Sequence, residues 1–205
     1  MQLTGDWQKA SKLAEGLAGR FQKSVAAALM AEGQYLRGQI VKGIRSGAPG
    51  GKAFAPLSPI TLAVRRFRGF GGSKPLIATG SLVGSIVAVR IGGGVFVGIS
   101  RSAKSKGGKG LANIGEIHEF GRTWTQPLSS KARRFLFAAL RASGLSQGSG
   151  PKAKGTSGGA ATITITIPAR PFIGPVLERD GKPEAVAKRF WERVAQGMGG
   201  DLGRP

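Results

Sequence analysis

The N-terminal segment of the chain carries large apolar side chains at a regular four-residue spacing. The row comprises Leu13, Leu17, Phe21, Val25 and Leu29, and it continues beyond Gly33 with Leu36, Ile40 and Ile44. Residues that lie four apart share one face of an α-helix. The pattern therefore predicts either one long helix that reaches about residue 45 and is weak near Gly33, or two helices that meet there.

A second, shorter helix is predicted after the Gly- and Pro-rich stretch 46–51. Ser58 and Pro59 match an N-cap residue followed by proline at the first helical position. The helix should run from Pro59 to about Arg68, because Gly69 follows and stops it. The arginines at its C-terminal end complement the helix dipole.

Two patterns rich in β-branched residues predict strands. The ranges 85–91 and 95–99 are separated by three glycines (92–94), which is typical of an antiparallel hairpin. A short helical turn should precede this hairpin near 79–84. The range 162–167 alternates threonine with isoleucine, so we expect a strand with one buried face.

Three further helices are predicted in the second half of the chain. A short one should cover 111–121, a second should be capped by Ser129 or Ser130, and a third should open near Pro183. The last two are amphipathic, and their apolar faces comprise Ala132, Phe135, Leu136, Ala139 and Leu140, and then Val186, Phe190, Val194 and Met198.

These elements predict an α+β fold. We expect a small antiparallel sheet, a long N-terminal helix and a C-terminal helix packed on that sheet, and long Gly-rich basic loops. The 205 residues should form a single domain. Its segments would be an N-terminal helical part (1–47), a helix–hairpin–helix core (48–121), a basic helical and Gly-rich insertion (122–160), and a strand with the C-terminal helix (161–205).

The charge of the chain is strongly unbalanced. It has 31 Lys and Arg against 10 Asp and Glu, a net charge of +21, and no acidic residue lies between Glu32 and Glu116. Such a chain repels itself and attracts polyanions or acidic protein surfaces. The candidate contact residues form three clusters, which are Arg65, Arg66 and Arg68; Arg101, Lys104, Lys106 and Lys109; and Lys131, Arg133, Arg134 and Arg141, extended by Lys152 and Lys154.

Candidate catalytic chemistry is scarce. The chain has no cysteine and one histidine, which argues against thiolate or multi-histidine metal sites. His118 and Glu119 are adjacent on a predicted helix, so they do not face each other as an acid–base pair. We expect no enzyme activity, no cofactor and no small-molecule ligand. The first residues contain no apolar stretch typical of a signal peptide, and no apolar run is long enough to span a membrane. We therefore expect synthesis and use in a bacterial-type cytoplasm.

Four segments resemble a known family when they are taken together. FAPLSPITLAVRR, KPLIATGSLVGSI, IHEFGR and ITIPARPFIGP follow one another in this order between about residues 30 and 195. Their order and spacing resemble those of the virion morphogenesis and tail completion proteins of Mu-like and P2-like phages. The chain departs from the family between the third and fourth segments, where Arg122 to Ile167 replaces a short link.

The resemblance implies a non-catalytic subunit of the phage neck, the junction of head and tail. Such proteins look like ring formers of about six or twelve copies around the DNA channel. The implied partners are further copies of the chain, neck, portal or tail proteins, and the packaged double-stranded DNA. The residues that the resemblance marks as structural are Pro56, Pro59, Gly80, His118, Phe120, Gly121, Pro168, Arg170, Pro171 and Phe172.

Physical reasons support several of these positions. Pro56 and Pro59 would rigidify the start of a helix, and His118 and Phe120 could pack against the sheet from a helix end. Prolines 168, 171 and 175 would fix an extended link before the last helix. Composition alone leaves a second interpretation open, which is a basic nucleic-acid-binding protein of ribosomal or nucleoid-like type.

Overall fold

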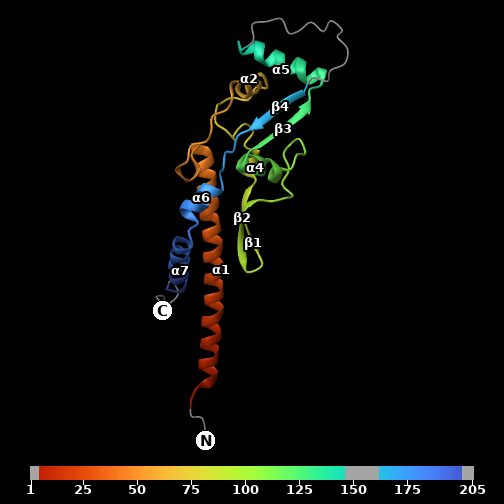
Figure 1. The fold of residues 1–205 in the computed structure, drawn as a ribbon. Helices are drawn as coiled ribbons and strands as arrows, with labels where there is room; N and C mark the ends of the chain where they lie inside the picture. Colours follow the sequence, from red (N-terminus) through yellow and green to blue (C-terminus); the bar gives the residue numbers. More distant parts are fainter. Residues whose placement is uncertain (1–4, 146–161, 200–205) are drawn as a thin grey trace, which may run out of the picture.

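The computed structural model describes residues 5–145 and 162–199, and it has an elongated shape built along one long helix (Figure 1). This helix, α1 (Trp7–Ser46), is 40 residues long and continuous, so it spans about 60 Å. The structure therefore selects the one-helix alternative. Gly33 does not break α1, because this position is buried against Val95 and Ala88 of a strand pair.

The order of the elements after α1 largely follows the predicted one. A short 3₁₀ turn, η1 (Pro49–Gly51), precedes α2 (Pro59–Phe67), and the Ser58 hydroxyl accepts the Thr61 N–H at 3.2 Å. This contact confirms the predicted N-cap. The remaining elements are α3 (Ser81–Gly84), β1 (Ile86–Ile91), β2 (Gly94–Ile99), α4 (Leu111–Phe120), β3 (Arg122–Pro127), α5 (Ser130–Ala142), β4 (Thr162–Ile167), α6 (Gly174–Asp180) and α7 (Pro183–Gly199).

The described strands form two separate antiparallel pairs rather than one sheet. β1 and β2 are a hairpin in which Ile91 lies opposite Gly94, so the turn has two residues, Gly92 and Gly93, instead of the predicted three. β4 is the predicted alternating strand, and its partner is β3. The sequence pattern did not predict β3, which begins the stretch expected to be helical and Gly-rich.

Two predictions about the C-terminal part are wrong. α7 packs along α1 rather than on a sheet, as Figure 1 shows. The link before it is not extended throughout, because Pro175 lies in the first turn of α6, where its missing N–H leaves no helical hydrogen bond unmade. The α+β class itself holds, with a long N-terminal helix, a C-terminal helix and small antiparallel strand pairs.

The hydrophobic core is small and lies at the C-terminal end of α1. Ile40 and Ile44 are fully buried there, and they pack with Ile86 of β1 and with Phe172 and Val176 around α6. The N-terminal half of α1 has no such cover, so Leu13 is 64 % exposed and Phe21 is 44 % exposed. The apolar row of the sequence is therefore buried only along its second half.

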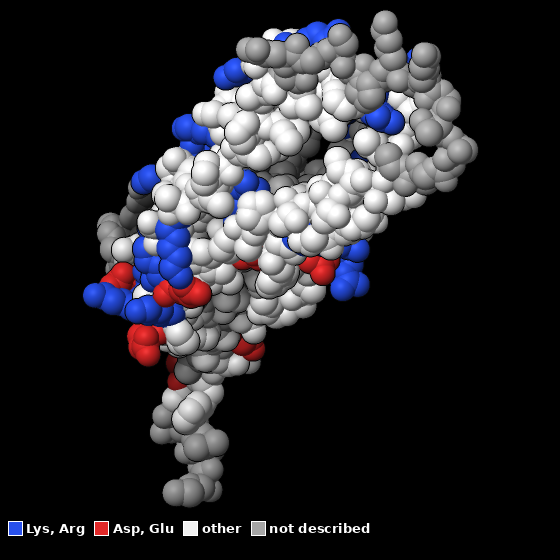
Figure 2. Space-filling view, turned by 45° about the horizontal axis from the view of Figure 1, so that its top comes forward, with Lys and Arg blue, Asp and Glu red and all other residues white. Residues whose placement is uncertain are grey.

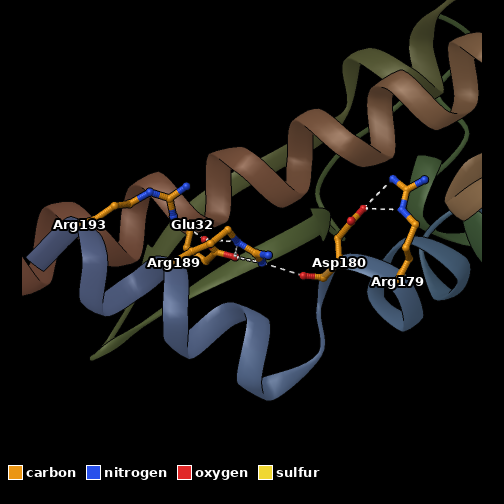
Figure 3. A network of polar contacts seen from close by, with 5 residues as sticks. All are labelled: Glu32, Arg179, Asp180, Arg189 and Arg193. Carbon is orange, nitrogen blue, oxygen red and sulfur yellow. Dashed lines mark hydrogen bonds and ion pairs between the residues drawn. The ribbon is translucent and has the colours of Figure 1, made fainter.

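A buried ion-pair network fastens α7 to α1 (Figure 3). Glu32 of α1 is 5 % exposed and pairs with Arg189 and Arg193 of α7. Arg189 also donates to the Asp180 carbonyl at 2.7 Å and stacks over the Tyr35 ring. Burial opposes ionisation of Glu32, but the hydrogen bonds and charges of the two arginines outweigh it and hold its pKa below the ordinary value of 4.5.

Within the described ranges, no helix combines the length and the apolar character that crossing a membrane requires.

Candidate binding groove and basic surface

The carboxylate of Glu119, at the end of α4, holds the start of α6. It accepts the backbone N–H groups of Phe172, Ile173 and Gly174 at 2.8, 3.1 and 2.8 Å. Such charge-assisted bonds are stronger than neutral ones, and those to Ile173 and Gly174 satisfy N–H groups that a helix start leaves without partners. The His118–Glu119 pair is therefore not an acid–base dyad, because Glu119 is fully engaged with the backbone.

The side chain of Arg170 joins two more segments to the same place. It is 5 % exposed and donates to the carbonyls of Ala55 and Pro56 at 2.7 and 2.8 Å. Its own backbone N–H donates to the carbonyl of His118 at 2.6 Å. Burial, together with the nearby charge of Arg65, lowers the pKa of the Arg170 guanidinium. The segment before α2, the end of α4 and the segment after β4 thus form one joint.

His118 lies beside this joint. Its Nδ1 atom is buried and has no hydrogen-bond partner among the described residues. Burial, and then the charges of Arg170 and Arg65, lower the pKa of the imidazole below 6.5. His118 is therefore neutral at pH 7.

A groove of about 700 Å³ opens over the joint, between α2, the segment 75–82, α4 and β4. Most of its lining is apolar and comes from prolines, leucines and isoleucines. The charged or titratable groups in it are Arg65, His118 and Arg170, and no Asp or Glu lines it. The hydroxyl groups come from Ser58, Thr61, Thr79, Ser81, Ser105 and Thr166.

The structure gathers many of the expected structural residues around this groove. Its lining includes Pro56, Pro59, His118, Pro168 and Arg170, which are far apart in the sequence. Of the others, Phe172 is buried in the core, Pro171 is half-buried, and Gly80 and Gly121 have positive φ values of 70° and 76° next to helix ends. Phe120 was expected to pack against the sheet, and this is wrong, because it is 77 % exposed.

Two of the three basic clusters lie on neighbouring elements. α2 packs on α5 through the Phe67 and Phe135 rings, whose centroids are 5.4 Å apart, and Arg68 stacks over Phe135. The first cluster therefore adjoins the third, whose four described members all lie on α5 and are exposed. Lys152 and Lys154 lie outside the described residues. The second cluster lies on the loop between β2 and α4, which a bridge between Lys104 and Gly110 closes into a compact turn.

We call α2, β3, α5 and β4 together the basic lobe. These four elements contain no Asp or Glu, and their cations are Arg65, Arg66, Arg122, Lys131, Arg133, Arg134 and Arg141. Figure 2 shows Lys and Arg without acidic neighbours over the upper part of the visible face, while the red acidic side chains lie lower down. The acidic residues that the structure describes are confined to α1, α4, α6, α7 and the segments next to them. The charge of the molecule is therefore segregated in space.

Sequence reasoning missed Glu119 and Glu32 as structural anchors. Both are acidic residues in an acid-poor chain; Glu32 is buried and Glu119 is half-buried, and a carboxylate withdrawn from water needs partners. The small number of acidic residues in the chain was the sequence signal that could have indicated a structural role for these two. Comparisons of the chain with protein-family models, curated proteins and solved structures give no match.

Proposed function

We propose that the chain is a structural subunit of the head–tail connector of a tailed bacteriophage. It would form a ring of about six or twelve copies around the DNA channel and complete the head or the tail for joining. Its partners would be neighbouring copies, adjacent neck, portal or tail proteins, and the packaged DNA. Its place would be the neck of the virion, after assembly in the cytoplasm of the host, and it would have no enzymatic role.

One observation carries this proposal. The four sequence segments that resemble the phage family are not scattered in the structure, since they meet in one joint. Arg170 of the fourth segment binds carbonyls of the first, and Glu119 of the third binds backbone N–H groups of the fourth. Leu82 of the second packs in the same core as Phe172. The segments that carry the resemblance therefore act together as one structural unit.

The distribution of apolar surface supports an assembly role. Large side chains are exposed along α1 and α7, with Trp7 at 62 % and Trp191 at 56 %. Protein–protein contacts cover apolar side chains where these form a continuous face, as the four-residue row of α1 does. An elongated subunit with a small core and exposed apolar side chains along α1 and α7 suits a ring in which neighbours complete one another.

The first test is the mass of the purified full-length chain by light scattering at moderate salt, with and without nuclease. The connector proposal expects a discrete, nuclease-resistant mass near six or twelve times 21.2 kDa. Electron microscopy of negatively stained particles should then show rings with a central opening. A nuclease-resistant monomer at concentrations well above the micromolar range would contradict self-assembly of this chain.

The acid-free basic lobe favours a second candidate, a nucleic-acid-binding protein. That candidate expects a monomer that enlarges only with nucleic acid present. It also expects affinity for duplex DNA to fall steeply with salt, because each phosphate contact releases counterions. The nuclease comparison separates the two candidates directly.

A further inference from the structure

The groove over the joint combines features that point to a ligand of one kind. Three side chains that carry or can carry positive charge, Arg65, His118 and Arg170, line the same groove, and no carboxylate among the described residues lines it. Glu119, the nearest acid in sequence to His118, is occupied by three backbone N–H groups. The guanidinium groups of Arg65 and Arg170 repel each other in this partly buried site, and an anion between them would relieve that repulsion.

The rest of the groove favours a peptide. Its apolar lining includes Leu57, Leu76 and Ile114. One wall is β4, from which three consecutive residues, Ile165, Thr166 and Ile167, line the groove, so the strand presents its edge as well as its faces. Only one edge of β4 is paired with a strand in the described structure, and that partner is β3. A free strand edge beside apolar pockets is the setting in which an extended peptide adds as a further strand.

We propose that this groove binds an extended acidic segment of another protein. One carboxylate of the segment sits among Arg65, His118 and Arg170, its neighbouring apolar side chains cover the prolines and leucines of the lining, and its backbone runs along the free edge of β4. This inference rests on the groove alone and does not depend on the connector proposal.

Two arguments select the partner. A sugar–phosphate backbone is strongly hydrated and gains little from an apolar lining, whereas a peptide can place apolar side chains on it. A second copy of the chain offers few suitable segments among its described residues. Its carboxylates either pair with cations or backbone groups, as Glu32 and Glu119 do, or lie on helices, as Glu116 and Glu192 do.

The experiment selects from a randomised octapeptide library on the immobilised full-length chain at about 0.3 M salt, which weakens contacts between exposed charges. The best peptide and its Asp→Asn or Glu→Gln counterpart are then measured by fluorescence anisotropy. We expect enrichment of an acidic residue flanked by apolar ones, and at least about tenfold weaker binding of the amide counterpart.

Matched variants distinguish binding in the groove from nonspecific attraction to the positive charge of the chain. R65Q and R66Q each remove one cation from the same helix, but only Arg65 lines the groove. R65Q should weaken binding at least about tenfold, while R66Q should change it less than about twofold and R65K should retain most of it. Circular dichroism checks that each variant is folded. Equal losses for R65Q and R66Q would overturn the proposal, as would enrichment of peptides without an acid.

The single histidine gives an independent readout. Its imidazole proton resonances can be followed through a pH titration without ambiguity. A bound carboxylate should raise the pKa of His118, so the peptide should bind more tightly at about pH 5.5 than at about pH 7.5. His118→Gln should remove that pH dependence. If saturating peptide leaves the His118 titration unchanged, the peptide binds elsewhere and the proposal is wrong. If duplex DNA displaces the peptide and R65Q also loses DNA binding, the groove binds phosphate instead.

Discussion

In this cation-rich chain, single carboxylates hold separate segments together, and Glu119 is the clearest case. It lies at the end of α4 and binds three consecutive N–H groups at the start of α6. No other side chain among the described hydrogen bonds reaches those groups. The position of the segment 170–174, and with it Arg170 at the groove, therefore depends on one negatively charged residue.

Glu119→Gln should destabilise the fold by about 2 kcal/mol, because an amide replaces a charged acceptor of three hydrogen bonds. Glu116→Gln on the same helix is the matched control, since Glu116 is exposed, and it should change little. Urea unfolding followed by circular dichroism measures both. Equal effects of the two substitutions would refute this role of Glu119.

A second prediction at this scale concerns pH and Glu32. Its pKa is depressed in the folded chain, so its contribution to stability is complete above 4.5 and is lost as the pH falls through the folded pKa. Glu32→Gln should cost about 3 kcal/mol near pH 7, because Arg189 and Arg193 lose their partner. It should also flatten the loss of stability between about pH 5 and about pH 3.

Thermal unfolding across that pH range tests the prediction. The control is Glu178→Gln, which breaks the exposed pair of Lys52 and Glu178. Exposed pairs contribute little, so this control should retain the stability and pH profile of the unsubstituted chain. A Glu32→Gln chain with an unchanged acid transition would show that other carboxylates govern it.

Among the elements, α1 organises the molecule, because the β1–β2 hairpin, η1, α6 and α7 all pack on it. Two of its glycines have opposite environments. A side chain at Gly33 would collide with Val95, whereas nothing lies within 4 Å of such a side chain at Gly38. Gly33 is thus a packing position, and Gly38 is an exposed helical position that only costs backbone entropy.

Gly33→Ala should therefore destabilise the chain by about 1 kcal/mol, because overpacking of the hairpin outweighs the gain in helix propensity. Gly38→Ala should stabilise it by about 0.5–1 kcal/mol. Chemical denaturation compares the two variants with the unsubstituted chain. A stabilising Gly33→Ala would mean that the hairpin does not pack closely on α1.

The elements that the sequence predicted are those specified by local signals. Ser58 followed by Pro59 fixes the start of α2, and the Thr–Ile alternation fixes β4, since both patterns act over a few residues. β3 was missed because Arg122–Pro127 is mostly exposed and has no clean alternation. Its strand conformation comes from pairing with β4, where the hydroxyl of Thr123 donates to that of Thr166, 43 residues further along the chain.

The groove could not be predicted from the sequence either, because it too depends on contacts between distant segments. Each of its residues could be named as a motif position, but no local pattern states that Arg170 binds Ala55 or that Arg65 adjoins His118. These contacts follow from tertiary packing. The segments that carry the family resemblance could thus be found in the sequence, while the joint and the groove that they build required the structure.

At the scale of the whole molecule, charge is the dominant feature. The net charge of +21 is not spread evenly, since the basic lobe contains no acidic residue, while most of the described acidic residues lie on or next to α1, α6 and α7. A polyanion or an acidic protein should therefore approach the lobe first, because the local field rather than the total charge steers association. This holds for a ring subunit and for a nucleic-acid-binding protein alike.

Two variants with the same loss of charge test this segregation. One replaces Lys131, Arg133, Arg134 and Arg141 of α5 by glutamine, and the other replaces Lys9, Lys12, Arg20 and Lys23 of α1. All eight side chains are exposed, so both variants should fold with nearly unchanged unfolding midpoints. The α5 variant should elute from a heparin column at distinctly lower salt than the α1 variant, because it loses cations from the acid-free surface. The α1 variant loses cations from a helix that also contains Glu15 and Glu32 and follows Asp6. Equal elution of the two variants would show that total charge alone governs the attraction, and the basic lobe would then have no special part in binding.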